Sequence, residues 1–512
     1  MLLALILIPL LTAIAVALSP RTSPTLPRLL SLAATASTFV IAVVLFLRFD
    51  IAGGMQFVQK LPWVPSLGLQ LSVGVDGLNI GLILMGCIVA FAATAVSWDI
   101  KEDQKGFYSL LLVMIGGILG AFVSQDLFWL YFFHELALIP TFIMIGVWGR
   151  GENKNYATFN ITMYLTLGAL IALSGLILLY VQMPVGSRTF DIQAMTEHFQ
   201  RAPIADADQS LIFALLMFGF GILVSLWPFH TWAPLGYGAA PTANAMLHAG
   251  VLKKFGLYGL LRIALPMLPA GAHRWLPVLA LLCLGNLLYC GWVAMRQKNL
   301  NSLIGNSSVA HMGFCFLGIA SLTLVGMTGA VVVMIAHGLL AALSFGLSGY
   351  LQSQTGTLEI PRLGGLLRQL PFIGASLLIA MFAGCGVPGF ANFAGELMVL
   401  FGSWKSGITG QWLVVAAAWA GLIIGAVYML RAIRSVLHGP AAPNAPRYID
   451  ATGSRRWPYA LLIAALLLFG IAPRLLTDAI KPSAEAILQL AVTGKSATAT
   501  PPAPILKAST TH

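Results

Sequence analysis

The sequence predicts an all-α polytopic membrane protein with about fourteen transmembrane helices, and three observations lead to this prediction. Of the 512 residues, 58% are hydrophobic and only 9% are charged, whereas about a quarter of the residues are charged in a soluble domain. Apolar runs of about 20 residues, the length that crosses a bilayer as a helix, recur along almost the whole chain. These runs are too long and too unalternating for a β-barrel, and lipid requires backbone groups to pair within each segment.

The apolar runs define the candidate spans in chain order. They cover residues 2–18, 28–48, 76–98, 107–124, 127–149, 156–182, 211–232, 243–265, 275–295, 302–322, 325–351, 371–402, 411–434 and 457–475. The first run lacks the basic start of a cleaved signal peptide, so we expect it to stay in place as a span. The tail from about Thr493 is rich in Ala, Thr and Pro and is predicted to be mobile.

The net charge of +11 comes largely from basic residues in short loops on one side of the predicted spans. These residues are Arg21, Arg28, Lys101, Lys105, Arg150, Lys154, Arg296, Lys298, Arg362, Arg368, Arg431, Arg434, Arg447, Arg455 and Arg456. Such loops remain on the inner side of a membrane, which places both termini on the outer side. Because this rule accounts for the positive charge, the charge does not indicate nucleic-acid binding.

Several kinds of cofactor site are not expected in this chain. The five cysteines, Cys87, Cys283, Cys290, Cys315 and Cys385, fall in apolar segments without a C-x-x-C pair, which argues against iron–sulfur clusters, zinc and disulfides. Histidines and acids do not cluster at metal-ligand spacing. The chain also has no G-x-x-x-x-G-K-[ST] or G-x-G-x-x-G motif for a nucleotide.

The seventh and twelfth spans are predicted to be discontinuous. The seventh contains SLWPFHTWAPLGYGAAP with three prolines, and the twelfth contains GCGVPGFANFAGE with one proline and four glycines. Unwound backbone at membrane depth is tolerated only inside protein or beside a water-filled cavity. Paired interruptions in corresponding halves indicate inverted repeats and an ion path, and a five-helix repeat would superpose these two.

Few ionisable residues lie at membrane depth. Glu135, in LFWLYFFHELALIPTFIMIGVWG beside His134, is interpreted as a proton-relay carboxylate, because a buried charge must pair, face the interior or change protonation. Glu396 follows the second interruption and is interpreted as a relay or gate, the alternative being an acid stabilised by the start of a half-helix. Asp76 opens the third span and is expected to be a cap or an interfacial acid.

Two adjacent lysines and several histidines complete the candidate site. Lys253 and Lys254 lie about 100° apart on a helix, so one can face the interior while the other extends to an interface, and the pattern favours Lys254 for the interior. The histidines fall in or near the same spans, where they are either packed and hydrogen-bonded or part of a hydrated chain of titratable groups. They are His230, His248, His311 and His337.

Six stretches, in this order and spacing, resemble the antiporter-like membrane subunits of respiratory complex I, the family of NADH-quinone oxidoreductase subunit M (chain 4). They are FFHELALIPTFIMIGVWG, WPFHTWAP, GVLKKFGLYGLLR, NSLIGNSSVAHMGF, AHGLLAALSFGLSGYL and GVPGFANFAGELMVLFGSW, and they cover most of residues 107–434. The resemblance implies an N-terminal three-helix region (1–106), two inverted five-helix repeats (107–265 and 275–434), and a last helix with a mobile tail (435–512). It also places the family's relay residues at Glu135, Lys254 and Glu396.

The chain departs from this family at one position. Relatives usually carry a lysine on the seventh helix, shortly before P-F-H-T-W, where this sequence has Leu223. Without that cation Glu135 is less stabilised as an anion. Another base, such as His230, His248 or Lys253, would have to substitute through water, or the proton path would be altered.

The resemblance implies a proton-conducting subunit of a membrane-bound NADH:quinone oxidoreductase in the inner (plasma) membrane. Its partners would be the other membrane and peripheral subunits, and NADH, FMN, iron–sulfur clusters and quinone would be bound there rather than in this chain. Two alternatives use the same scaffold. One is a subunit of a multi-subunit cation/proton antiporter or membrane-bound hydrogenase, and the other is a structural subunit with an inactive proton path.

Overall fold

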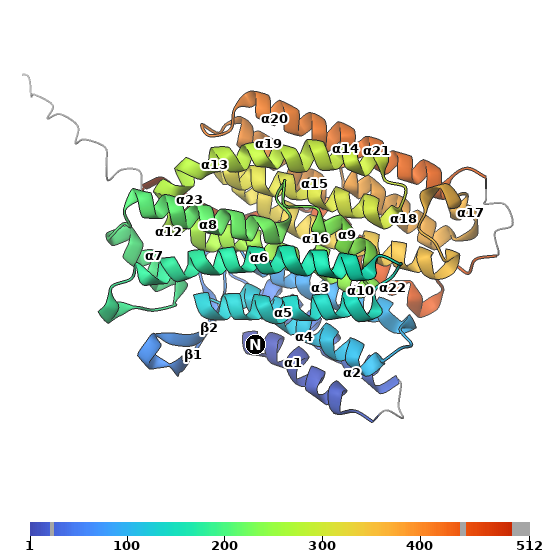
Figure 1. Cartoon of the computed structure of the whole chain (residues 1–512), viewed down its shortest axis with the longest axis horizontal. Coiled ribbons are helices and arrows are strands. Elements are labelled where there is room, and N and C mark those ends of the chain that lie inside the picture. The colour runs from blue at the N-terminus through green and yellow to red at the C-terminus, as the bar shows by residue number, and fades with distance from the viewer. Residues whose placement is uncertain (21–24, 441–446, 494–512) are drawn as a thin grey trace, which may run out of the picture.

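Long apolar helices run side by side through the whole molecule in the computed structural model of the chain (Figure 1). The structure describes residues 1–20, 25–440 and 447–493. The tail that was predicted to be mobile lies, from residue 494 onward, outside the described residues.

In the described residues, the N-terminal region and the first half of the bundle contain twelve α-helices and one hairpin. They are α1 (Leu2–Leu18), α2 (Thr25–Arg48), β1 (Gln56–Val64), β2 (Leu69–Val75), α3 (Ile80–Val96), α4 (Gln104–Val123), α5 (Leu127–Trp148), α6 (Lys154–Val181), α7 (Ile192–Arg201), α8 (Asp206–Val224), α9 (Trp232–Ala239), α10 (Thr242–Gly250), α11 (Phe255–Gly259) and α12 (Leu265–Met267).

The described part of the second half of the bundle continues with eleven further α-helices. They are α13 (Pro269–Leu284), α14 (Cys290–Arg296), α15 (Leu300–Ala320), α16 (Leu324–Thr355), α17 (Leu366–Gln369), α18 (Pro371–Gly384), α19 (Ala391–Trp404), α20 (Gln411–Ala418), α21 (Gly425–Ala432), α22 (Trp457–Ile471) and α23 (Arg474–Thr493). Short π-helical segments join α11 to α12, α13 to α14 and α20 to α21 into single longer rods.

Ten helical segments of the described chain are long and apolar enough to cross a membrane, and α1, α3 and α18 are apolar but shorter. These segments coincide with the apolar runs of the sequence, because lipid selects helices with few charges along their whole length. The predicted all-α membrane fold is confirmed.

Both predicted interruptions are present. The seventh span ends as α8 at Val224, where Ser225 adopts a left-handed conformation with φ of 73°, and resumes as α9 at Trp232. The twelfth ends as α18 at Gly384 and resumes as α19 at Ala391, with Gly386 and Gly389 at positive φ between them. The prolines and glycines therefore break these spans where the sequence predicts.

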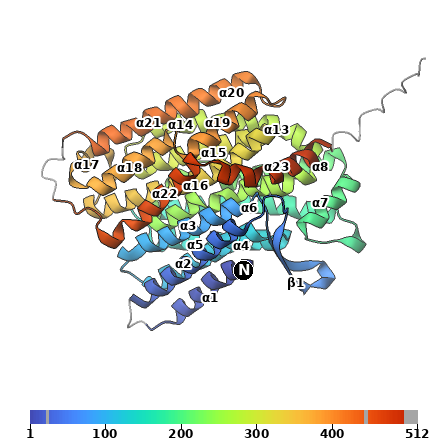
Figure 2. The same cartoon turned by 180° about the vertical axis from the view of Figure 1, so that it is seen from behind.

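Three elements on one end of the bundle were not predicted. An antiparallel hairpin, β1–β2, and helix α7 lie at the same end in Figure 1, and α23 runs along the bundle surface in Figure 2. Helix α23 packs on α12, α13 and α16. It follows the last predicted span and ends at Thr493, where the tail predicted to be mobile begins. Its mixed polar and apolar residues do not form a span, so the search for apolar runs missed it.

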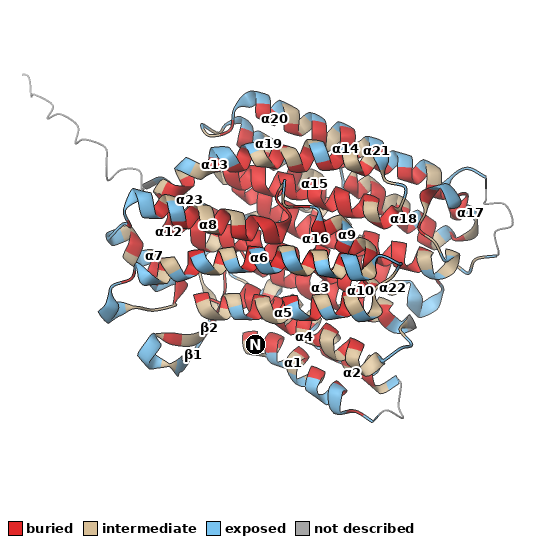
Figure 3. Ribbon diagram, viewed as in Figure 1, coloured by how far each residue is buried: buried red, intermediate tan, exposed pale blue. Residues whose placement is uncertain are grey.

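The centre of the bundle is formed by α15 and α16. Figure 3 shows them as almost continuously buried, and every residue in the most apolar part of each helix is buried. Both carry polar side chains in this setting, including His311 on α15 and His337 on α16. Polar side chains in a fully enclosed helix need protein or water partners.

Candidate functional site

The eighth predicted span is also interrupted, at the point where the two lysines enter the core. Helix α10 ends at Gly250, Val251 leaves helical geometry, and Leu252–Lys254 forms one 3₁₀ turn before α11. Successive side chains in a 3₁₀ turn point about 120° apart. Lys253 and Lys254 therefore reach different neighbours, although both are buried, with exposures of 1% and 0%.

Lys254 contacts a histidine of the central helix α16. Its Nζ donates to the Ala249 carbonyl oxygen at 2.7 Å and lies 2.8 Å from His337 Nδ1. Interruption of the helix leaves carbonyl groups without their usual amide partners, and the Lys254 ammonium binds one of them. The second contact is short enough for a proton to pass between the lysine and the imidazole.

Further titratable side chains lead from His337 toward Glu396. The His337 and His311 rings have centroids 5.4 Å apart, and His311 Nε2 lies 3.6 Å from Glu396 Oε1. All three side chains are buried. Four titratable side chains from the eighth, tenth, eleventh and twelfth predicted spans thus form one row, the Lys254–Glu396 row, made of Lys254, His337, His311 and Glu396.

The orientation of His311 is fixed by neighbours on α15 and α21. Its Nδ1 lies 2.7 Å from the Ser307 carbonyl oxygen, and Ser307 Oγ lies 3.1 Å from the Tyr428 hydroxyl. A carbonyl oxygen only accepts, so His311 Nδ1 carries a proton. Nε2 is consequently the ring atom available to exchange a proton with Glu396.

Glu396 lies against the interruption of the twelfth span. A Cβ atom at Gly386 would come within 2.9 Å of Glu396 Oε2, so a glycine at this position allows the carboxyl group to approach the backbone. Among the described residues, Glu396 Oε1 and both amide atoms of the buried Asn392 have no hydrogen-bonding protein partner. Buried polar atoms of this kind are where ordered water binds.

Lys253 points away from the Lys254–Glu396 row. Its Nζ donates to Ser308 Oγ at 3.3 Å and lies 5.6 Å from the centroid of the Tyr237 ring. The Tyr237 hydroxyl is in turn 3.1 Å from His248 Nδ1. His248 is near enough to both lysines for their charges to act on it.

Glu135 is only partly buried, and it pairs with the neighbouring His134. Its side chain is 32% exposed, on the face of α5 that points away from the bundle, and Oε1 lies 3.2 Å from His134 Nδ1. His134 is buried and stacks on Phe255 with ring centroids 4.0 Å apart. Glu135 therefore reaches the core through His134 and does not join the Lys254–Glu396 row. Leu223 is buried in α8.

A cavity of about 680 Å³ with a mixed polar and apolar lining, which we call the Arg150 cavity, opens beside the first interruption. It extends from the loop that carries Arg150 and Glu152 to His230, Ser302 and Asn306. The loop residue Arg150 belongs to the predicted inner face. His230 thus lines this cavity and does not belong to the Lys254–Glu396 row.

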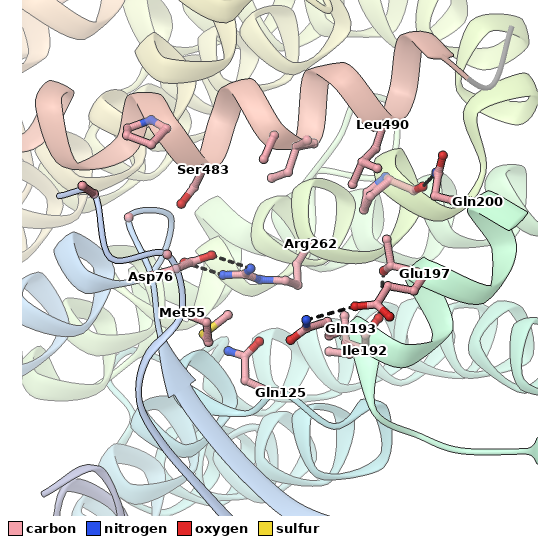
Figure 4. A pocket seen from close by; sticks show the side chains of 18 of the residues that line it. Met55, Asp76, Gln125, Ile192, Gln193, Glu197, Gln200, Arg262, Ser483 and Leu490 are labelled. Carbon is pink, nitrogen blue, oxygen red and sulfur yellow. Dashed lines mark hydrogen bonds and ion pairs between the residues drawn. The ribbon is translucent and has the colours of Figure 1, made fainter. Parts of the chain in front are cut away.

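The other end of the eighth span is closed by an ion pair that the sequence did not indicate. Arg262 binds both carboxylate oxygens of Asp76 at 2.6 Å, as Figure 4 shows. Asp76 also accepts the backbone N–H groups of Leu78 and Asn79, as expected of a capping acid before α3. The pair lines a second cavity of about 610 Å³ beneath α7 and α23.

Asn286, which sequence analysis did not single out, supports the first interruption. Its Oδ1 accepts the Trp227 backbone N–H at 2.8 Å and its Nδ2 donates to the Ser225 carbonyl at 2.8 Å. Asn286 could have been noticed in the sequence because it is a polar residue inside an apolar run, as are Ser307 and Ser308. Its partner could not be known before the fold, because the contact joins two separate spans.

Comparison with known proteins identifies the family. The family model described as "NADH:quinone oxidoreductase/Mrp antiporter, TM" matches residues 124–424, which include both interruptions and the Lys254–Glu396 row. This chain belongs to the NADH:quinone oxidoreductase/Mrp antiporter family. No group of three or more His, Cys, Asp or Glu side chains suited to a metal ion occurs in the part of this family member that the structure describes.

Relatives within the NADH:quinone oxidoreductase/Mrp antiporter family are similar over nearly the whole chain. NADH-quinone oxidoreductase subunit M of Rhodobacter capsulatus is 32% identical, with 90% of each protein covered. A chain of respiratory complex I from Thermus thermophilus is 29% identical with a TM-score of 0.87, covering 96% of this chain and all of that chain. A chain of the Mrp complex from Dietzia has a TM-score of 0.82 at 18% identity, covering 96% and 98%, and shows the shared fold.

Proposed function

We propose that this chain is a proton-translocating membrane subunit of a complex I type NADH-quinone oxidoreductase. Its similarity to subunit M and to a complex I chain over about nine-tenths of its length supports the assignment. The observation that carries the mechanism is the buried Lys254–Glu396 row, in which each member lies next to the following one. Charged groups are costly at membrane depth and typically mark an ion pathway.

In this mechanism a proton enters from the inner side, reaches Lys254, and passes through His337 and His311 to Glu396. Glu396 releases it toward the outer side through the interruption between α18 and α19. Moving a charge against the membrane potential costs about 2.3 kcal/mol per 100 mV. Partner subunits, which would hold NADH, FMN, iron–sulfur clusters and quinone, supply that energy by changing the charges around the row.

The proposed orientation of the chain in the membrane follows from the positive charge of its loops. The face with Arg150, Lys154, Arg296 and Lys298 lies on the inner side of the inner (plasma) membrane, and both termini lie on the outer side. Residues 107–265 and 275–434 form the two inverted five-helix repeats, and their interruptions supply the inner and outer ends of the path.

Glu396→Gln tests the row directly. Glutamine keeps the size and hydrogen bonding of the side chain but cannot carry the proton, so we expect normal assembly and loss of translocation through this chain. The measurement is NADH-driven proton uptake by the complex in liposomes, with the exposed Glu485→Gln as control. Normal proton uptake by an assembled Glu396→Gln complex would contradict the proposal that the Lys254–Glu396 row carries the protons.

Glu135→Gln is expected to weaken the coupling between NADH oxidation and proton translocation, without stopping translocation through this chain. The partly exposed carboxylate is placed to sense a charge on a neighbouring subunit, so its loss should lower the protons moved per NADH while assembly stays intact. The control is Glu102→Gln, on an exposed loop. An unchanged proton-to-NADH ratio would contradict the proposed role of Glu135 in sensing charge on a neighbouring subunit.

Co-purification from detergent-solubilised membranes distinguishes the remaining assignments. Quinone-reductase subunits are expected with this chain, whereas antiporter or nickel–iron hydrogenase subunits would assign it to those relatives. A purely structural subunit has no reason to keep four buried titratable groups in a row, since each is costly in an apolar core.

A further inference from the structure

Lys253 is a second buried lysine whose role the Lys254–Glu396 row does not explain. It is 1% exposed and its Nζ contacts a hydroxyl group and an aromatic ring, both of which are neutral. No carboxylate forms an ion pair with Lys253 or Lys254 among the described residues. An amine with no counter-charge in the core is expected to gain and lose its proton as part of its function.

The two lysines are also adjacent in the chain, and this couples them. Two ammonium groups close together in a medium of low dielectric constant repel strongly, because water does not screen them. Without a carboxylate between them, full charge on one disfavours charge on the other. We therefore expect Lys253 and Lys254 to hold a proton alternately rather than together.

Lys253 is on the side of the Arg150 cavity, whereas Lys254 is on the side of the row. Helix α9 separates the cavity from Lys253: Pro234 and Gly238 line the cavity, and Tyr237 of the same helix faces Lys253. Helix α15 forms the other boundary, with Asn306 on the cavity and Ser308 bonded to Lys253.

His230 lies in the first interruption and lines the Arg150 cavity, with its Nδ1 3.2 Å from the Pro228 carbonyl oxygen. An imidazole at the end of a polar cavity can accept a proton on one nitrogen and release one from the other.

We propose that Lys253 is the proton-loading residue of this chain, and that its protonation from the Arg150 cavity drives the proton of Lys254 onto His337. This rests on the proposed function and names its entry step. A proton from cavity water passes through His230 to the neutral amine of Lys253, which becomes an ammonium. Lys254 then gives its proton to His337 Nδ1 and becomes a neutral amine. The proton of Lys253 passes to that amine, which returns both lysines to their starting states after one proton has entered and one has moved on.

The first test measures NADH-driven proton uptake by the intact complex in liposomes. Lys253→Met keeps an unbranched side chain of similar volume and removes the amine. We expect translocation through this chain to fall by roughly a hundredfold, as proton transfer without its carrier does. Lys298→Met, an exposed lysine on the same face, should leave uptake unchanged. Normal uptake with Lys253→Met but not with Lys254→Met overturns the loading role alone. Normal uptake with both overturns the proposed function.

The second test asks whether the Arg150 cavity is accessible from the proposed inner face. It can be carried out even if the Lys253→Met variant does not assemble. Asn306→Cys in the otherwise unchanged complex should react with a membrane-impermeant, charged thiol reagent added to the Arg150 face and not to the other. Ser376→Cys, buried in α18 away from the cavity, should not react from either face. Failure of Asn306→Cys to react from the Arg150 face, or reaction from the opposite face, overturns the entry route.

Discussion

Lys254→Met is expected to abolish proton translocation through this chain while the complex still assembles. Methionine fills the same volume but removes the amine that lies 2.8 Å from His337 Nδ1, so the first member of the row is lost. A positioned proton carrier contributes about 10²–10⁴-fold to proton transfer, so translocation should fall by at least the lower figure.

The measurement is the proton-to-NADH ratio of the complex in liposomes, and Lys405→Met, at the exposed end of α19, is the matched control. Lys254→Arg should not restore function, because a guanidinium group does not release its proton. A complex with Lys254→Met that pumps at the normal ratio would show that protons bypass the row.

Arg262→Met is expected to destabilise the chain more than Lys254→Met or Glu396→Gln does. It leaves the Asp76 carboxylate without its partner, and both side chains of the pair are only 10% exposed. Breaking a buried ion pair by removing one partner costs about 3–5 kcal/mol. The expected result is a lower melting temperature of the purified complex and less of this chain retained in it.

The double variant Asp76→Asn with Arg262→Met separates charge from packing. It removes both charges while the asparagine oxygen can still accept the N–H groups of Leu78 and Asn79. Stability should return most of the way toward the original, because replacing both members of a buried pair is often close to neutral. A double variant as unstable as Arg262→Met would assign the effect to lost packing of the arginine.

The sequence allowed the bundle and its interruptions to be predicted because lipid imposes simple requirements. Apolar runs of sufficient length must be helices, and prolines and glycines in such runs must unwind them. Lys254 and Glu396 were selected on the same grounds, as charges where charge is costly. The row itself was not predictable, because His337 and His311 meet only when α16 packs on α15.

The direction in which Glu135 points could not be predicted from the sequence. Helix α5 is apolar on every side, so its pattern does not reveal which side faces the interior. The Asp76–Arg262 pair joins positions 186 residues apart, and its partners could not be matched by inspection. The hairpin, α7 and α23 were missed because they lie in segments of mixed polarity, where apolar length gives no signal.

The partly exposed Glu135 has a consequence for biogenesis. A copy of this chain inserted before its neighbours would present a carboxylate directly to fatty-acyl tails, which solvate it poorly. A neighbouring subunit packed against α5 would shield this carboxylate from lipid. A copy of the chain made without its neighbours is therefore expected to be less stable in the bilayer than an assembled one.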